Sequence, residues 1–228
     1  MGDHGKKAAL FEQFAVVGKA LGSGKRLELL DLLSQGERTV ESLANTAGLG
    51  LSTASAHLQT LKRSGLVTTR RDGTRIHYDL AGADVAQLFS LVRTVAHTHL
   101  AEVEQRRVDY LGLAETTGGD TPQEMTREEL LARSKAGTVT VLDVRPREEF
   151  QASHLPGALS IPLDQLSERL DEIPSDRDVV AYCRGAYCVL AYEAVHLLNN
   201  NGRHARRLAE GMLEWRLANL PVSPESAA

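Results

Sequence analysis

Two cysteines lie close together in a segment of the chain whose composition suits thiol chemistry. Cys183 follows an apolar run at 179–182, and Cys188 precedes a predicted helix that begins near Val189. A loop between a buried strand and a helix directs backbone N–H groups and the positive end of the helix dipole at one point, and both lower the pKa of a thiol. We therefore predict that Cys183 is a nucleophilic thiolate whose substrate is small and anionic. The alternative is a buried cysteine that only packs.

The predicted active-site loop also contains a positive charge and a second thiol. It consists of Cys183, Arg184, Gly185, Ala186, Tyr187 and Cys188. For Cys188 two interpretations remain: it resolves a sulfur adduct on Cys183 as the second member of a redox pair, or it packs the end of the loop. Two cysteines are too few ligands for a structural zinc ion, so we expect no metal and no other cofactor here.

The elements that must position this loop alternate between strands and helices after residue 123. The predicted strands span 139–144, 178–182 and 206–208, and the predicted helices span 127–134, 166–170, 189–200 and 212–218. This alternation predicts an α/β domain with a mostly parallel sheet. Ligands of such sheets bind at the carboxyl ends of the strands, which is where Cys183 is expected to lie.

Several separated motifs in this half resemble those of a rhodanese domain, a sulfurtransferase family, over about residues 124–221. They are Leu142-Asp143-Val144-Arg145, Glu148-Glu149-Phe150, His154-Leu155-Pro156-Gly157-Ala158, Ile161-Pro162-Leu163 and Tyr182-Cys183-Arg184-Gly185, with Glu210-Gly211-Met212 and Trp215. The resemblance implies that Cys183 accepts sulfane sulfur as a persulfide and passes it to a thiol acceptor. It therefore predicts sulfurtransferase activity with thiosulfate or another sulfane-sulfur donor. It makes Asp143, Arg145 and His154 supporting residues, structural first and catalytic second.

The length of the loop and its last residue separate this domain from relatives of the rhodaneses. Related phosphatases and arsenate reductases carry an arginine after five intervening residues, where this chain has Val189. This disfavours phosphate or arsenate as the substrate. The last loop position, often basic or threonine in rhodaneses, is Cys188 here, which leaves the sulfur donor open.

The first half of the chain has a different pattern, with helices followed by a hairpin. The predicted helices span 6–21, 25–33, 39–47, 52–64 and 84–111, with Thr39 and Ser52 as the caps of the third and fourth. The predicted strands span 66–70 and 75–80. The two strands are joined around Asp72-Gly73, which is a strong hairpin signal. Two helices joined by a glycine-containing turn and followed by a hairpin predict a winged helix-turn-helix, mainly α with a β-hairpin wing.

Basic and short polar side chains gather on the second helix of this motif and on the hairpin. From Leu51 to Arg75 there are five basic residues and one acidic residue, whereas residues 1–112 as a whole carry +2 and residues 113–228 carry −6. Such side chains contact phosphates and base edges. The predicted DNA-binding residues are Ser52, Thr53, Ser55, Gln59, Lys62, Arg63, Arg70, Arg71 and Arg75. The alternative is a solvated basic face without a ligand.

Residues 8–111 resemble the ArsR-type family of bacterial winged-helix repressors. The resemblance rests on three segments, 52–58, 61–67 and 71–78. It implies a homodimer, formed by the first and last helices of this half, that binds double-stranded operator DNA and releases it when a signal binds. The metal sites of that family are incomplete here, because this half has no cysteine and two of four ligands are replaced by Ala86 and Leu100.

A polar segment with two glycines and a proline, at 115–123, divides the two halves. We predict an ArsR-like DNA-binding and dimerisation domain at 1–112, a linker at 113–123 and a rhodanese domain at 124–228. No apolar run approaches the roughly 20 residues needed to cross a bilayer, so we expect a cytoplasmic protein with no membrane partner.

The two halves together predict a homodimeric transcriptional regulator that binds operator DNA. Its rhodanese domain is expected to carry or sense sulfane sulfur through a persulfide on Cys183, supplied by a small anionic donor and removed by a thiol acceptor. Two alternatives remain. One is a sulfurtransferase whose winged helix serves mainly dimerisation, and the other is a repressor whose rhodanese module is catalytically inactive.

Overall fold

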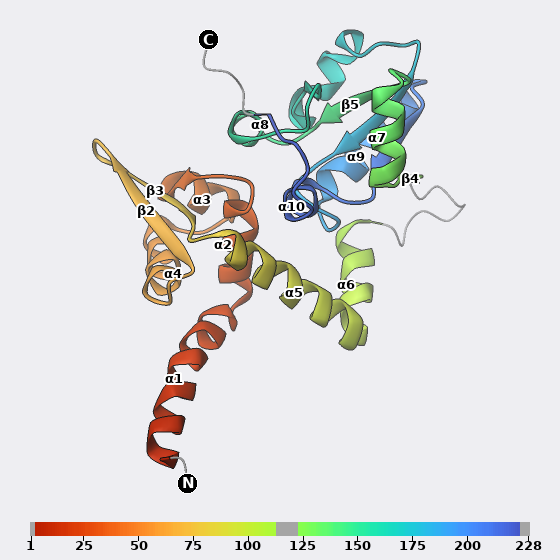
Figure 1. Ribbon diagram of the computed structural model, residues 1–228. Helices are drawn as coiled ribbons and strands as arrows, with labels where there is room; N and C mark the ends of the chain where they lie inside the picture. The colour runs from red at the N-terminus through yellow and green to blue at the C-terminus, as the bar shows by residue number, and fades with distance from the viewer. Residues whose placement is uncertain (1–2, 113–122, 224–228) are drawn as a thin grey trace. The chain divides into compact units, whose positions relative to one another are not determined.

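The computed structural model describes residues 3–112 and 123–223, and the chain divides into two compact units (Figure 1). The first unit is Met1–Val92 and the second is Arg93–Ala228. Helix α5, Ala83–His99, crosses this division, so its last turns belong to the second unit. The linker predicted at 113–123 lies, apart from Gln123, outside the described residues.

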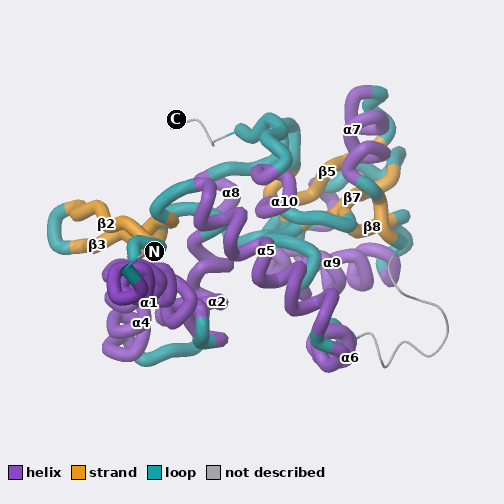
Figure 2. The backbone as a smooth tube through the Cα atoms, turned by 60° about the horizontal axis from the view of Figure 1, so that its bottom comes forward, coloured by secondary structure: helices purple, strands orange, loops and turns teal. Residues whose placement is uncertain are grey.

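The first unit is a winged helix-turn-helix, as the sequence predicts. Its helices before α5 are α1 (His4–Leu21), α2 (Gly24–Leu33), α3 (Val40–Thr46) and α4 (Leu51–Arg63), and its strands are β1 (Arg38–Thr39), β2 (Val67–Asp72) and β3 (Arg75–Leu80). The strands form an antiparallel sheet in the order β1-β3-β2. Figure 2 shows the β2–β3 hairpin projecting from the helices of this unit as the wing.

Local capping explains where the two helices of the helix-turn-helix motif begin. The Thr39 side chain caps α3 by accepting a hydrogen bond from the backbone N–H of Ser42 at 3.2 Å. Helix α4 begins one residue before the predicted cap Ser52, because Gly50 occupies the N-cap position. Gly48 makes the tight turn between the two helices with a positive φ of 61°, which glycine adopts without strain.

The long helix predicted over 84–111 is wrong in one respect, because it is two helices. Leu100 takes an extended backbone conformation, with φ −111° and ψ 106°, and becomes the N-cap of α6 (Ala101–Tyr110). An extended residue cannot continue the i to i−4 hydrogen bonds, so the helix ends at His99 and starts again.

The second unit is an α/β domain built on a five-stranded parallel sheet. Its further elements are β4 (Glu124–Met125), α7 (Arg127–Lys135), β5 (Val139–Asp143), α8 (Arg147–Ala152), β6 (Leu159–Ser160), the 3₁₀ helices η2 (Leu163–Glu168) and η3 (Leu170–Glu172), β7 (Asp178–Tyr182), α9 (Val189–Asn200), β8 (Ala205–Leu208) and α10 (Met212–Leu217). The strand order is β4-β8-β7-β5-β6. The sequence did not predict α8, and the helix predicted at 166–170 is a pair of 3₁₀ turns.

The sheet buries a different apolar cluster on each face. Because alternate residues of a strand point to opposite faces, Val179 and Ala181 pack in the cluster that contains α9, and Cys183 continues that row. Val180 and Tyr182 pack in the other cluster, which contains residues of α7 and α10. The cysteine therefore lies at the carboxyl end of a central strand, on the side covered by α9.

Among the helices of residues 3–112 and 123–223, none has the length and the apolar composition that a membrane-spanning segment requires.

The packing of α4 predicts a clear difference between two leucines on the same helix. Leu58 is fully buried, whereas Leu51 is about half exposed. Leu58→Ala leaves a cavity in the core, so we expect the free energy of unfolding of the first unit to fall by about 2–5 kcal/mol. For the control Leu51→Ala we expect a change within about 0.5 kcal/mol. Urea unfolding followed by circular dichroism measures both, and equal losses would contradict this packing.

Candidate functional site

The cysteine loop, residues 183–188, connects the end of β7 to the start of α9 as predicted. Cys183 is 1% exposed, and its Sγ lies 3.4 Å from the carbonyl oxygen of Cys188 and 3.8 Å from that of Gly185. The backbone N–H of Cys188 donates to the carbonyl oxygen of Gly185 at 3.1 Å, which closes the loop into a turn. Both thiols are free, and Cys188 is the more exposed of the two.

The two thiols differ in acidity, and the pKa of Cys183 shifts in the direction opposite to the predicted one. Burial raises the pKa of Cys183 well above its ordinary value, and the hydrogen bond with Cys188 raises it further. The hydrogen bond from the Cys183 thiol lowers the pKa of Cys188, with help from the backbone N–H groups of Arg184 and Leu190. The prediction of a lowered pKa at Cys183 was therefore wrong, because complete burial outweighs the amide groups around it.

The positive charge predicted beside the thiol has a carboxylate partner. The Arg184 guanidinium donates to Glu149 of α8, with Nη2 2.7 Å from Oε1 and Nε 3.0 Å from both oxygens. Glu149 is 2% exposed, so this pair anchors the loop to α8. Glu149 lies in a motif that the sequence singled out, but its role as the partner of Arg184 was not predicted.

Helix α10 packs directly on the backbone of the loop. The N–H groups of Met212 and Leu213 donate to the carbonyl oxygens of Cys183 and Arg184 at 3.0 and 3.1 Å. A Cβ atom on Gly211 would lie 2.2 Å from the backbone nitrogen of Gly185, so only glycine fits between the two segments. The start of α10 thus holds the first half of the loop on one side.

Of the three supporting residues, Asp143 and Arg145 belong to a buried network at the strand ends, and His154 packs on Phe150. The Arg145 guanidinium and the Asp143 carboxylate form a fully buried ion pair, with Nη2 2.6 Å from Oδ2. The Tyr182 hydroxyl donates to the same carboxylate, and burial together with that carboxylate raises the pKa of Tyr182, which keeps the proton on the phenol. The His154 ring stacks on Phe150 with centroids 3.7 Å apart, and its Nδ1 lies 2.9 Å from the Phe150 carbonyl oxygen. This network holds the ends of β5 and β7 together.

Two of the cavities in the described part of the second unit differ in character. One has a volume of about 420 Å³ and reaches Ala186 and Tyr187 of the cysteine loop. Its other lining residues, mostly charged, are His97, Glu104, Arg107, Glu124, Arg207 and Ala209. A small charged molecule therefore has a polar space beside the loop.

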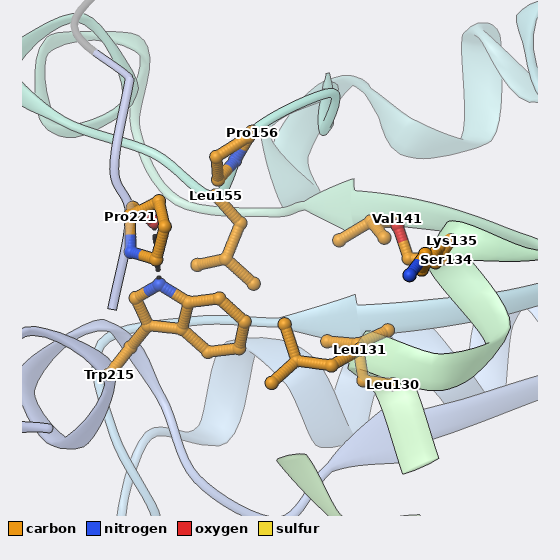
Figure 3. A pocket seen from close by; sticks show the side chains of 9 residues that line it. All are labelled: Leu130, Leu131, Ser134, Lys135, Val141, Leu155, Pro156, Trp215 and Pro221. Atoms are coloured by element: carbon orange, nitrogen blue, oxygen red, sulfur yellow. Dashed lines mark hydrogen bonds between the residues drawn. The ribbon is translucent and has the colours of Figure 1, made fainter. Parts of the chain in front are cut away.

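The other cavity, of about 250 Å³, is mostly apolar (Figure 3). Trp215 forms one wall and donates from Nε1 to the carbonyl oxygen of Pro221 at 2.8 Å. Leu130, Val141, Leu155 and Trp215 belong to the apolar cluster on the face of the sheet that does not contain Cys183. This cavity is therefore separate from the cysteine loop.

The predicted DNA-binding residues lie on the outer surface of α4 and of the wing. Ser52, Thr53, Lys62, Arg63, Arg70, Arg71 and Arg75 are exposed, while Ser55 and Gln59 are half-buried. The Gln59 amide donates to the Tyr78 hydroxyl at 3.0 Å, and Arg70 donates to Glu37 at 3.0 and 2.7 Å. Gln59 and Arg70 thus have protein partners in this structure, which the sequence did not indicate.

Two family profiles match the chain. That of the bacterial regulatory proteins of the arsR family matches residues 23–69, and that of the rhodanese-like domain matches residues 126–218. The HTH-type transcriptional regulator Rv0324 of Mycobacterium tuberculosis is 56% identical over 221 residues, which cover 97% of this chain and 95% of that protein. This chain belongs to the ArsR family and carries a C-terminal rhodanese-like domain. Both resemblances drawn from the sequence are confirmed.

Two further proteins resemble parts of this ArsR-family regulator. A protein named Sulfurtransferase from Allochromatium vinosum is 36% identical over 101 residues, covering 42% of the regulator and 92% of that protein. A solution structure of a homodimeric winged helix-turn-helix DNA-binding domain from Mycobacterium bovis, a possible ArsR-family transcriptional regulator, is 57% identical. It covers 45% of the regulator and 94% of that chain, with a TM-score of 0.42.

The sequence predicts no metal site in this regulator, because the ligand sets of the ArsR family are incomplete in it. Within residues 3–112 and 123–223, no three His, Cys, Asp or Glu side chains are grouped so that they would hold a metal ion.

The different acidities of the two thiols predict a distinctive pH profile for alkylation. The pKa of Cys188 is lowered, so its thiolate forms at a lower pH than that of an ordinary cysteine, about 8.5, whereas Cys183 ionises above that pH. We expect iodoacetamide to modify Cys188 first as the pH is raised, as measured by peptide mass mapping. In Cys183→Ala the alkylation profile of Cys188 shifts to higher pH, because the alanine side chain has no group that donates a hydrogen bond to the Cys188 thiolate. Modification of Cys183 before Cys188 would contradict the order of acidities.

Proposed function

We propose that this regulator is a homodimer that binds operator DNA and carries sulfane sulfur as a persulfide on Cys183, which changes its affinity for the operator. The observation that carries the proposal is the thiol pair in the loop. Cys183 receives hydrogen bonds from the backbone N–H groups of Ala191 and Gly185, which favour its thiolate, and Cys188 is its neighbour. A purely structural cysteine needs neither feature.

The thiol pair explains how a buried Cys183 becomes a nucleophile. Cys188 loses its proton first, and its thiolate then accepts the proton of Cys183 across the hydrogen bond that joins them. The pair as a whole thus carries one negative charge, stabilised by backbone N–H groups and by Arg184. Cys188 is therefore the base, and Cys183 is the attacking thiolate.

Sulfur uptake and release follow as two balanced displacements. The Cys183 thiolate attacks the terminal sulfur of a donor such as thiosulfate, a new S–S bond forms, and the donor's S–S bond breaks. The donor remnant, sulfite in that case, leaves with the electron pair. A thiolate acceptor then attacks the outer sulfur of the persulfide, takes it as its own persulfide and restores the Cys183 thiolate. The polar cavity that reaches Ala186 and Tyr187 offers such a donor a space beside the loop, lined by basic and acidic side chains alike.

The DNA-binding part of the proposal rests on the exposed surface of α4 and the wing. The exposed basic residues are Lys62, Arg63, Arg70, Arg71 and Arg75. In the winged helix-turn-helix arrangement the second helix enters the major groove, and such basic side chains contact the phosphates on either side. A protein that binds the chromosome in this way acts in the cytoplasm.

The proposed homodimer explains an apolar surface on α1. Leu10, Phe11 and Phe14 of this helix are each more than half exposed. Figure 1 shows α1 extending away from the other helices of its unit. Clustered exposed aromatic and aliphatic side chains mark association surfaces, and a second copy of this chain offers the matching one.

The role of Cys183 is tested with two serine variants of the full chain. We expect thiosulfate or inorganic polysulfide to add sulfur to the wild-type chain, seen by intact mass, and to change its affinity for its operator about 5- to 150-fold. Cys183→Ser should show neither the adduct nor the change. The matched variant Cys188→Ser should still accept sulfur at Cys183, but roughly 100-fold more slowly near neutral pH, because the base is missing.

The outcomes of this test separate the proposal from its two alternatives. Sulfur turnover without operator binding at any salt concentration would favour a plain sulfurtransferase. Operator binding without a sulfur adduct on Cys183 would favour a repressor with an inactive rhodanese module. Either result overturns the proposed function.

The DNA surface predicts a specific effect of Arg75→Ala, which removes an exposed guanidinium from the wing. If Arg75 contacts a phosphate in each protomer, the slope of log K against log salt falls by about 2 for the dimer. The control Arg177→Ala removes an exposed arginine of the second unit and should leave the slope unchanged. Equal slopes for Arg75→Ala and the wild type would contradict a wing contact.

A further inference from the structure

The last turns of helix α5 contact the cysteine loop through Arg93. Its Nη2 lies 3.2 Å from Oε1 of Glu214 on α10, and its Cζ lies 4.6 Å from the centroid of the Tyr187 ring. The side chains of Arg93 and Glu214 are 17% and 22% exposed, so solvent screens this ion pair little. All three residues belong to the second unit, and we call them the Arg93 cluster.

The Arg93 cluster touches the backbone of the loop as well as Tyr187. A Cβ atom on Gly185 would lie 3.2 Å from Oε2 of Glu214 and 3.5 Å from Nη1 of Arg93. Glu214 is itself fixed, because it accepts a hydrogen bond from the backbone N–H of Gly211 at 3.0 Å. The His97 ring, one turn further along α5, lies edge-on to Tyr187 with centroids 6.3 Å apart. A movement of the loop at Gly185 or Tyr187 must therefore move this cluster.

Addition of a sulfur atom to Cys183 forces such a movement. The thiol is 1% exposed, and the carbonyl oxygens of Cys188 and Gly185 already lie 3.4 and 3.8 Å from its Sγ. The loop has no room to move toward α10, because the backbone of Gly211 is packed against Gly185. Close-packed interiors accommodate an added atom only by shifting their neighbours. The residues that remain to shift are those between Gly185 and Cys188, which include Tyr187.

We propose that Arg93 is a positioning residue of the cysteine loop, which transmits the displacement caused by sulfur uptake at Cys183 to helix α5. This inference rests on the proposed function, because it requires that Cys183 accept sulfur. Helix α5 begins at Ala83 in the first unit, where Val85 and Phe89 are buried. A change at Arg93 therefore acts on a helix that is also packed within the DNA-reading unit.

The first test follows α5 directly and does not involve DNA. The full-length chain is loaded with inorganic polysulfide, loading is confirmed by intact mass, and hydrogen exchange is measured on peptides that cover 93–99. We expect loading to change exchange there in the wild type and to leave it unchanged in Arg93→Ala. Unchanged exchange in the fully loaded wild type overturns the inference.

The second test measures operator affinity before and after loading in the same variants. In the wild type we expect the operator affinities before and after loading to differ about 5- to 150-fold. In Arg93→Ala this affinity ratio should fall to within about twofold of unity, although the variant still accepts sulfur. Arg93→Lys keeps the charge but loses the planar group that stacks on Tyr187, so its ratio should lie between the two. The control Arg106→Ala removes an exposed arginine of α6 and should keep the wild-type ratio.

Two further outcomes keep the inference separate from the proposed function. A loading-dependent change at 93–99 without any change in operator affinity supports the role of Arg93 and contradicts the proposed regulation. If the operator affinity of Arg93→Ala changes on loading as much as that of the wild type, the role of Arg93 is contradicted and the proposed regulation by sulfur is not. Should Arg93→Ala fold poorly, Glu214→Gln removes the charge of the partner, keeps its size and is expected to reduce the same ratio.

Discussion

Complete burial of Cys183 at the carboxyl end of β7 is the constraint on which the rest of the site depends. A buried thiol resists ionisation, and the pKa of the neighbouring Cys188 is lowered, so in the proposed chemistry Cys188 carries the negative charge first. Burial also means that nothing can be added to the sulfur without displacement of the loop. The same feature thus accounts for the acid–base pairing of the two thiols and for the mechanical sensitivity of residues 185–188.

The surroundings of the loop determine which of its parts can move. Arg184 is anchored to the buried Glu149, and α10 holds the carbonyl groups of Cys183 and Arg184. Asp143 and Arg145 stabilise the strand ends beneath the loop through a buried ion pair, whose disruption typically costs about 3–5 kcal/mol. The first half of the loop is therefore held on two sides, and the displacement that we propose falls on Tyr187 and the Arg93 cluster.

Much of this architecture could be predicted from the sequence, because it depends on local patterns. The hairpin at Asp72-Gly73, the cap at Thr39 and the strand–loop–helix around Cys183 each have a signal in neighbouring residues. The break at Leu100, the partner of Arg184 and the contact between Arg93 and Glu214 have no such signal. Arg93 and Glu214 are 121 residues apart, and their pairing depends on tertiary packing. The acidity of the thiols was misjudged for the same reason, since burial cannot be read from the loop alone.

The most direct test of the account is a titration in which sulfur loading and operator affinity are measured on the same samples. Increasing amounts of inorganic polysulfide are added to the whole chain, and each sample is divided between intact mass and a DNA-binding assay at fixed salt. The account predicts that the operator affinity follows the fraction of Cys183 that carries sulfur, and that a thiol acceptor reverses both together. Full loading of Cys183 with an unchanged operator affinity would contradict it.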